Sequence, residues 1–341
     1  MSFSSPIHKD PTKICNPDGV RKYAFVTFLM RNDNYLPGAL VLASGLKPWR
    51  AQADLVCMVT GSVSEGARRA LSVLFDHVVE VDETVLPHDR RQERQDRPYL
   101  FTRFSALRLG EDGDLGFQYR KVVVLDSDVL PLRSYGHLFT LGTPAGIINE
   151  RKSNCVTADP DGRFVVTEEV LSRGKWVWHE RYDAVCPHGQ PIPRDLTDRV
   201  RDDPSNMGVN ACLWVLRPSM NEYLAIMDEV LHDPDTASRV RSWNWPEMQY
   251  ATLRWSGQWK NVDLRFCSFN GYPALKVLFG VHYSGLKPWA IGRMDALRRF
   301  ARFADFRCWY EEFQRAMKEH PELLSVARLK RMLEAIDSLT G

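Results

Sequence analysis

The sequence predicts a single α/β domain in which helices flank a mixed, mostly parallel, Rossmann-like sheet. Three observations support this fold class. Short apolar segments rich in Val and Leu recur along the first 125 residues of the 341-residue chain. Segments with helical apolar spacing lie between them, as in repeated βα units. Several of the apolar segments are continuous rather than alternating, which is typical of parallel strands covered on both faces.

The expected elements follow one another along the chain. We expect strands at residues 23–30, 54–60, 78–81, 121–125 and 210–216. We expect helices at residues 35–46, 64–75, 102–109 and 220–231. A charged loop is expected at 82–98, and the periodic pattern breaks between 139 and 205, where Gly, Pro and charged residues are frequent.

These elements predict one domain with two appendages. Residues 1–22 form an N-terminal extension, residues 23–289 the domain and residues 290–341 a basic helical tail. We interpret 139–205 as an insertion on the acceptor side of the domain. The tail is amphipathic, and we expect it to pack its apolar face onto the domain rather than to lie on a membrane.

Composition narrows the class of protein. The formal net charge is only +2, so no nucleic-acid partner is expected. The first residues hold no apolar run typical of a signal peptide, and no segment is apolar enough to span a membrane. The seven cysteines show no CxxC spacing, so they predict free thiols and not a zinc motif. We therefore expect a cytoplasmic small-molecule enzyme.

The segment KVVVLDSDVLPL carries the strongest chemical signal. Asp126 and Asp128 directly follow an apolar strand, at the sheet edge where α/β proteins bind ligands. Two carboxylates there repel each other unless a cation such as Mg²⁺ or Mn²⁺ intervenes. Three other D-x-D pairs, at 112–114, 159–161 and 233–235, lie in polar turns where capping explains them.

A second signal lies far downstream in GVHYSGLKPW. His282 is suited to completing a metal shell, Gly285 to letting the backbone approach a phosphate, and Lys287 to supplying a positive charge. Each of these three residues could instead have a purely structural role. That explanation is weaker when all three occur in one chain with the D-x-D pair.

Taken in order, these motifs resemble those of the glycogenin-like family 8 glycosyltransferases over residues 23–289. The segments YAFVTFLMRNDNYLPGALVLASGLK, LFTRFSALRL, LDSDVLPL, NACLWVLRPS and HYSGLKPW carry the resemblance. It implies a GT-A fold, a UDP-sugar donor, Mn²⁺ or Mg²⁺ as cofactor, and transfer with retention at the anomeric carbon. It also implies metal ligation by Asp126, Asp128 and His282.

The resemblance further implies which residues contact the donor. The expected catalytic residues are Asp128, Gln249 and Lys287. The expected donor contacts are Asn32, Tyr35, Arg97, Arg103, Ser127, Asn210, Ala211, Gln249, Gly285 and Lys287. The expected partners are the donor, a glycan or other hydroxyl acceptor and, as an alternative to a monomer, a second copy of the chain.

The chain departs from the family pattern at three places. The closing motif is one residue shorter between Gly285 and Lys287, Cys212 replaces a glycine, and Met248 stands where the family has a carboxylate. Glu247 is the one neighbour able to replace that carboxylate. A further difference is Phe269, which aligns with the tyrosine that glycogenin-like enzymes glucosylate on themselves.

We predict transfer of a hexose, with glucose as the first candidate and galactose or glucuronate as alternatives. A nucleotidyltransferase is disfavoured because residues 23–46 hold no Gly-rich phosphate loop. A non-catalytic nucleotide-sugar-binding or scaffold protein stays open because of Met248. The candidate acceptor surface comprises Trp176, Trp178, His179, Tyr182, His188 and Gln190. The alternative is that these residues belong to an insertion that packs on the domain and contacts no acceptor.

Overall fold

The computed structural model describes residues 15, 19–48, 53–89, 95–149, 157–158, 163–165, 185–203, 205–269 and 275–340. Its centre is a seven-stranded sheet with the strand order β10-β6-β9-β4-β1-β2-β3. The strands are β1 (Tyr23–Leu29), β2 (Asp54–Val59), β3 (His77–Glu80), β4 (Lys121–Leu125), β6 (Ala145–Ile148), β9 (Val209–Leu216) and β10 (Lys260–Asn261). Strand β9 runs antiparallel to both of its neighbours, whereas the other neighbouring pairs are parallel. The mixed, mostly parallel sheet predicted from the apolar segments is confirmed.

The predicted helices form close to their expected limits. The α-helices are α2 (Leu36–Leu46), α3 (Glu65–Leu74), α6 (Arg194–Asp202), α7 (Met220–His232), α8 (Pro234–Ser242), α9 (Pro246–Arg254), α10 (Met294–Phe300), α11 (Ala304–Glu319) and α12 (Ala327–Thr340). Side-chain caps fix several N-termini: Ser64 accepts a hydrogen bond from the backbone N–H of Ala67, and Asp233 from that of Thr236.

Segments of 3-10 helix connect these elements. They are η2 (Asp33–Tyr35), η4 (Arg97–Leu109), η5 (Gly136–Thr140), η7 (Leu264–Phe266), η8 (Leu275–Val277), η9 (Ile291–Arg293) and η10 (Pro321–Ser325). The 3-10 helix η4 begins at Arg97, five residues before the predicted helix, because Pro98 suits the first turn of a helix.

A second, three-stranded sheet brings distant parts of the chain together. Its order is β11 (Ser268–Phe269), β12 (Gly280–His282) and β5 (Val129–Pro131). Strand β5 directly follows the predicted metal-binding turn, and β12 carries His282. The antiparallel pairing of β12 with β5 sets His282 opposite Val129.

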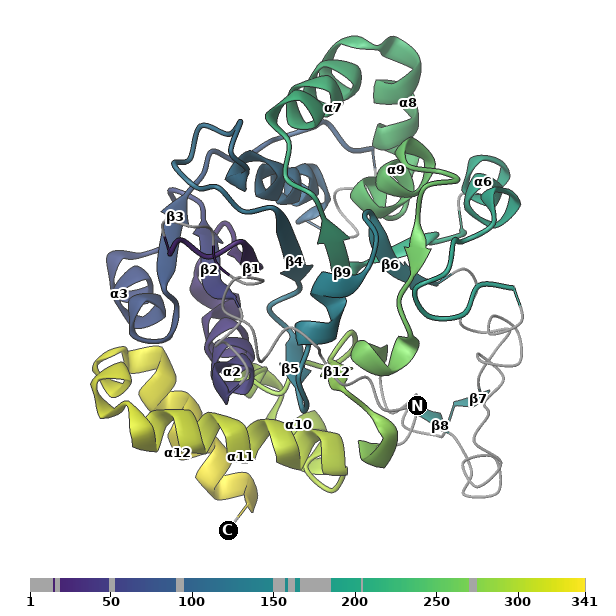
Figure 1. Cartoon of the computed structure of the whole chain (residues 1–341). Coiled ribbons are helices and arrows are strands. Elements are labelled where there is room, and N and C mark those ends of the chain that lie inside the picture. The colour runs from purple at the N-terminus through teal and green to yellow at the C-terminus, as the bar shows by residue number, and fades with distance from the viewer. Residues whose placement is uncertain are drawn as a thin grey trace.

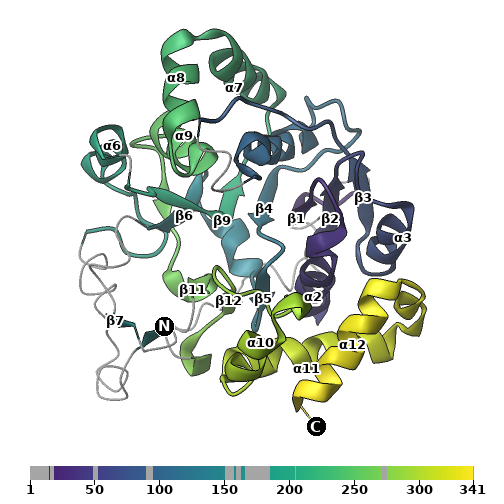
Figure 2. The same ribbon diagram turned by 180° about the vertical axis from the view of Figure 1, so that it is seen from behind.

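The C-terminal helices lie along one end of the molecule beside α2, whereas α7, α8 and α9 lie at the opposite end (Figures 1 and 2). Helix α11 buries Trp309, Tyr310 and Phe313, which are at most 1% exposed. Arg315 of the same helix donates a hydrogen bond to Ser44 Oγ of α2 at 3.2 Å. The expected packing of the tail onto the domain is confirmed.

The segment 139–205 is more regular than its composition suggests. It contains β6, an interior strand of the main sheet, and α6, as well as the two-stranded sheet of β7 (Thr157–Ala158) and β8 (Phe164–Val165). The expectation of an irregular segment beginning at 139 was wrong for β6, because four apolar residues after Pro144 are too short a run to identify a strand. Within the described ranges, no helix has both the length and the hydropathy to cross a bilayer.

Candidate functional site

A cavity of about 830 Å³ opens where β1 and β4 end. Ten of the residues predicted to bind donor or metal line it: Asn32, Tyr35, Arg103, Asp126, Ser127, Asp128, Asn210, Ala211, His282 and Lys287. The carboxyl ends of strands in an open α/β sheet are the place where a ligand site is expected. The sequence segments that carry the resemblance thus converge on one cavity.

Backbone pairing assembles the three predicted metal ligands. The N–H of Asp126 donates to the carbonyl of Cys212 at 3.0 Å, which ties the end of β4 to β9. The N–H of Tyr283 donates to the carbonyl of Asp128 at 2.9 Å, next to the β5–β12 pairing. His282 therefore reaches the D-x-D turn although more than 150 residues separate them in sequence.

The side chains of these residues face one another. His282 Nε2 lies 3.3 Å from Asp128 Oδ1 and 3.9 Å from Asp126 Oδ2. One ligand atom from each of the three residues lies within 4.8 Å of the other two. Two carboxylates and an imidazole form a donor set with affinity for Mg²⁺ or Mn²⁺.

Lys287 pairs with the same carboxylate. Its Nζ donates to Asp128 Oδ2 and, at 2.6 Å, to the carbonyl of Tyr283. Burial alone would raise the pKa of Asp128, but Lys287 and His282 outweigh it and hold this pKa well below its usual range. Asp128 is therefore ionised, as a metal ligand must be.

His282 occupies a strongly negative environment. Burial alone would lower its pKa, but Asp128 and then Cys212 raise it above the ordinary value. A protonated imidazole thus supplies positive charge between the carboxylates. A divalent cation would supply more of it and would displace the proton.

Arg103 holds the other carboxylate in place. Its Nη1 donates to Asp126 Oδ1 at 2.6 Å and to the carbonyl of Ala211 at 2.9 Å. The guanidinium is 8% exposed and lines the cavity. Arg103 therefore joins Asp126 to the strand that carries Asn210, whose Oδ1 accepts a hydrogen bond from the N–H of Cys212 at 2.9 Å.

The start of α2 forms another wall. Asn32 caps η2 by accepting a hydrogen bond from the N–H of Asn34 at 2.8 Å. The ring of Tyr35 lies edge-on against Trp289, with their centroids 5.5 Å apart. A Cβ atom on Gly38 would stand 2.4 Å from the carbonyl oxygen of Ser127 and 2.5 Å from Trp289 Cη2. Glycine here lets α2 approach the D-x-D turn and the closing motif.

Gln249 does not line the cavity. Its Oε1 accepts a hydrogen bond from the N–H of Trp245 at 2.9 Å, and its Nε2 donates to the carbonyl of Asn206 at 3.1 Å. The side chain is fully buried and holds backbone segments together. Glu247 and Met248 line the cavity instead. The expectation of a direct catalytic role for Gln249 is not supported by this position, since a helix directs neighbouring residues to different sides.

Two other predicted donor contacts lie outside the cavity lining. Arg97 donates from Nε to the carbonyl of Asn244 at 3.1 Å. Gly285 lies in an exposed turn between Ser284 and Lys287, which do line the cavity. Arg97 and Gly285 therefore lie next to residues of the cavity lining but are not part of the lining themselves.

Sequence reasoning did not single out Arg31 and Tyr99, which also line the cavity. Arg31 has a positive φ of 68°, unusual for a residue with a side chain, and its guanidinium stacks over Tyr99 at 4.3 Å. Burial would lower the pKa of the Arg103 guanidinium, but the carboxylates of Asp126 and then Glu247 raise it, so Glu247 lies close to the same guanidinium. The position of Arg31, just after β1, was a usable signal because strand ends face the ligand.

The candidate acceptor residues are only partly described. Trp176, Trp178, His179 and Tyr182 lie outside the described residues. The Nδ1 atom of His188 accepts a hydrogen bond from the N–H of Asp263 at 2.9 Å, and its ring stacks on Phe266 with centroids 5.6 Å apart. His188 therefore has a packing role, whereas Gln190 is exposed.

Two of the other D-x-D pairs have the structural roles expected of them. Asp112 Oδ2 accepts a hydrogen bond from the N–H of Met220 at 2.9 Å, and Asp233 caps α8. Asp114 pairs with Arg108 at 2.7 Å. The pair at 159–161 lies outside the described residues.

Several known proteins are similar to this chain in sequence. An uncharacterised protein of Acanthamoeba polyphaga mimivirus is 25% identical, with 78% of this chain and 82% of that protein covered. Galactinol synthase 2 of Solanum lycopersicum is 25% identical, with 66% of this chain and 59% of the synthase covered. Glycogenin-1 of Oryctolagus cuniculus is 37% identical over 116 residues, which are 34% of this chain and 33% of glycogenin. No protein-family model matches the chain.

A solved structure agrees with the sequence relatives. An active-site mutant of LgtC superposes with a TM-score of 0.50 at 13% identity, covering 84% of this chain and 94% of LgtC. At this identity the likeness shows the fold alone, which is GT-A. In sequence the chain is thus similar to glycogenin and to galactinol synthases, which agrees with the resemblance to the glycogenin-like family 8 glycosyltransferases. The chain matches 59% of the length of the galactinol synthase and 33% of that of glycogenin.

Proposed function

We propose that the chain is a metal-dependent, retaining glycosyltransferase that moves a hexose from a UDP-sugar to a hydroxyl acceptor. The convergence of Asp126, Asp128, His282 and Lys287 on one cavity wall carries this proposal. The relatives include a glycogenin and a galactinol synthase, whose names denote sugar-transferring or sugar-carrying proteins.

The residues present fit a divalent cation. The Oδ1 atom of Asp128 is buried and accepts no well-aligned hydrogen bond from the described residues, so a lone pair faces the metal position. Asp126 keeps 24% of its side chain exposed toward the cavity. Asp126, Asp128 and His282 would therefore hold Mn²⁺ or Mg²⁺, which when bound stabilises the negative charge of the diphosphate leaving group.

The chain's own cations complete the phosphate site. Lys287 is held by Asp128 and Tyr283 with its ammonium at the cavity wall, where it serves as a compact charge for a phosphate oxygen. Arg103 has an Nε atom that makes no hydrogen bond among the described residues, which leaves it one donor for the ligand. Charges fixed in advance favour the transition state because no reorganisation is needed during the reaction.

The wall formed by Asn32, Tyr35 and Tyr99 suits the nucleoside part of the donor. Two aromatic rings and an exposed amide can contact a base through stacking and hydrogen bonds. Asn210, Ala211, Glu247 and Met248 line the region beyond the carboxylates and are assigned to the sugar. In the family pattern a carboxylate stands at the position of Met248, and here the neighbouring Glu247 supplies it.

Glucose is the proposed hexose, with galactose and glucuronate as alternatives. A nucleotide-sugar-binding protein without activity is the second candidate function, and Met248 is the observation that favours it. A glycan acceptor, a homodimer and a cytoplasmic location stay predictions from the sequence.

A donor screen tests the proposal. Purified protein is incubated with UDP-glucose, UDP-galactose and UDP-glucuronate, with Mn²⁺ or EDTA, and released UDP is measured. We expect Mn²⁺-dependent UDP release from one donor above the others. Binding of UDP with Mn²⁺ but no release from any donor, with or without small-sugar acceptors, would favour the binding protein.

A further inference from the structure

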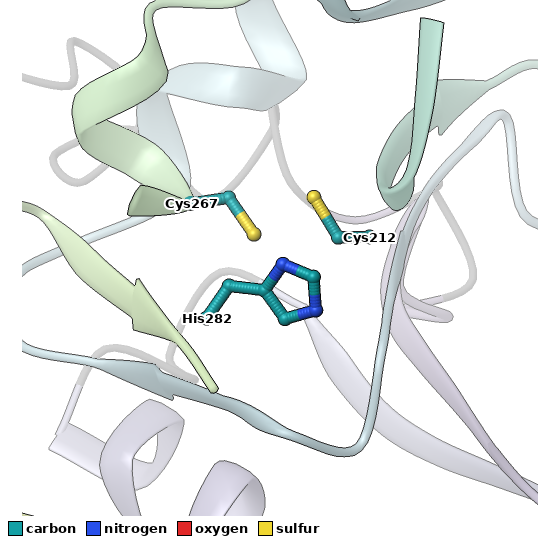
Figure 3. A group of neighbouring side chains, drawn as sticks. All are labelled: Cys212, Cys267 and His282. Carbon is teal, nitrogen blue, oxygen red and sulfur yellow. The ribbon is translucent and has the colours of Figure 1, made fainter. Parts of the chain in front are cut away.

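Two cysteines lie directly behind the predicted metal site. Cys212 and Cys267 are each 2% exposed, and His282 is 7% exposed. One ligand atom from each of the three residues lies within 4.8 Å of the other two. Figure 3 shows both sulfur atoms and one imidazole nitrogen turned toward a common point. Neither cysteine is among the residues that line the donor cavity.

The same backbone pairings that assemble the carboxylates bring the two thiols together. The carbonyl of Cys212 accepts the hydrogen bond from Asp126, which places its side chain beside the end of β4. Cys267 immediately precedes Ser268 of β11, which pairs with Val281 of β12. Because these pairings join three separate segments, no local CxxC spacing exists from which the cluster could be read.

The two nitrogen atoms of His282 face different donor sets. Nε2 lies 3.3 Å from Asp128 Oδ1, on the side of the cavity. Figure 3 shows Nδ1 on the side of the two sulfur atoms. Oxygen ligands thus surround one nitrogen and sulfur ligands the other. Hard cations such as Mg²⁺ and Mn²⁺ select the first set, whereas Zn²⁺ and similar cations bind thiolates and imidazole.

We infer that Cys212, Cys267 and His282 Nδ1 form a second metal site, specific for a thiophilic divalent cation such as Zn²⁺. The cation displaces three protons, one from each thiol and one from Nδ1 of the imidazolium, and binds two thiolates and one neutral imidazole. Two thiolates balance its charge, so the buried cluster carries no net charge. Three protein ligands leave one of the four tetrahedral positions for water.

The shared histidine makes the two sites compete. An imidazole that binds Zn²⁺ through Nδ1 keeps its proton on Nε2, which then donates to Asp128 and no longer binds a metal. Conversely, an imidazole that binds Mn²⁺ through Nε2 keeps its proton on Nδ1. Zn²⁺ therefore weakens Mn²⁺ binding. The competition with Mn²⁺ rests on the proposed function, whereas the binding of Zn²⁺ to the two cysteines and His282 does not.

Cobalt absorption tests the sulfur site without any measurement of activity. Metal-free, fully reduced protein is titrated with Co²⁺, and we expect a sulfur-to-cobalt charge-transfer band in the near ultraviolet that saturates at one ion and disappears on addition of Zn²⁺. The band should be lost in Cys212→Ala and in Cys267→Ala. It should persist in Asp128→Ala, which removes only the oxygen site, and in the control Cys57→Ala, which removes a buried thiol outside the cluster.

The variants are first checked by circular dichroism, and Cys212→Ser and Cys267→Ser replace any alanine variant that fails to fold. A second measurement follows Mn²⁺ by electron paramagnetic resonance, and saturating Zn²⁺ should weaken Mn²⁺ binding about tenfold or more. A band that survives both cysteine substitutions overturns the site. The absence of a band in protein whose thiols are titratable also overturns the site. If two thiols are missing before reduction, Cys212 and Cys267 form a disulfide in place of the metal site.

Discussion

Lys287 and Asp128 form an ion pair that joins the turn after β12 to the turn after β4. Only 8% of the Asp128 side chain and 20% of the Lys287 side chain are exposed. Burial alone would lower the pKa of Lys287, but the charge of Asp128 raises it, so both groups stay ionised. The pair keeps a positive charge beside a potential metal ligand, which is the arrangement that a diphosphate leaving group needs.

Replacing Asp128 tests the metal site. Asp128→Asn keeps the size of the side chain but removes the charge that the cation requires, so turnover should fall at least about 10²-fold and Mn²⁺ binding should weaken. Steady-state UDP release and Mn²⁺ titration measure the two effects. The control is Asp114→Asn, which makes the same substitution in another Asp-x-Asp pair, one that is exposed, and this variant should stay fully active. An active Asp128→Asn enzyme, or full activity in EDTA, would overturn the assignment.

Replacing Lys287 separates catalysis from folding. In Lys287→Ala the loss of a fixed charge should lower kcat about 10²-fold or more. With saturating Mn²⁺ the melting temperature should change little, because the cation neutralises Asp128 in place of the ammonium group. Thermal melts with and without Mn²⁺ and UDP-release rates provide the measurements, with exposed Lys276→Ala as control. Unfolding despite Mn²⁺ would show that Lys287 serves mainly to hold the closing motif.

Gly38 sets the distance between α2 and the D-x-D turn. A methyl group in Gly38→Ala would meet Ser127 and Trp289 at 2.4 and 2.5 Å, so the helix or the turn must move. We expect a loss of about 1–3 kcal/mol in the free energy of unfolding, together with weaker Mn²⁺ binding. Gly66→Ala in α3 is the control, since its nearest neighbour is 3.8 Å away and alanine favours a helix. Equal stability of the two variants in denaturant melts would contradict this account.

His188 should make the fold sensitive to mild acid. Burial lowers its pKa to about 4, so the folded state holds the neutral ring while the unfolded chain binds a proton below about pH 6.5. The contribution of neutral His188 to the free energy of unfolding is therefore fully present above pH 6.5. It is lost as the pH falls toward 4, by up to about 3 kcal/mol. In His188→Asn, which retains an acceptor for the N–H of Asp263, urea midpoints should fall less steeply over this range. Parallel profiles of wild type and variant would exclude His188 as the source.

Much of the fold was predictable because local signals and tertiary structure agree. Strand β4 forms at the expected residues 121–125, where a short apolar run is followed by two aspartates. Helix α3 begins after Ser64, a cap visible in the sequence. Strand β6 was missed because four residues give too little periodicity, and its stability comes from pairing with β9 and β10.

The site was predictable only where a motif encodes it. Asp126, Asp128, His282 and Lys287 occur in recognisable segments, and the structure brings them together. Gln249 lies outside the cavity lining, because a helical turn directs its side chain to the backbone around Trp245 and Asn206. The cluster of Cys212 and Cys267 could not be anticipated, since the register of β11, β12 and β5 creates it and no short-range spacing encodes that register.

A last prediction concerns self-glucosylation. In glycogenin-like enzymes the acceptor tyrosine precedes a Pro-Ala-Phe-Lys segment, and this chain has Pro273-Ala274-Leu275-Lys276, which aligns Phe269 with that tyrosine. Phenylalanine has no hydroxyl group, so no O-glycosidic bond can form there. We expect transfer to an external acceptor and no addition of hexose to the protein itself. Intact-mass spectrometry after incubation with UDP-glucose and Mn²⁺ decides the question, with Asp128→Asn as the inactive control. A ladder of hexose additions in wild type but not in the control would contradict the prediction, and its loss in Tyr272→Phe would then identify the nearby tyrosine as the acceptor.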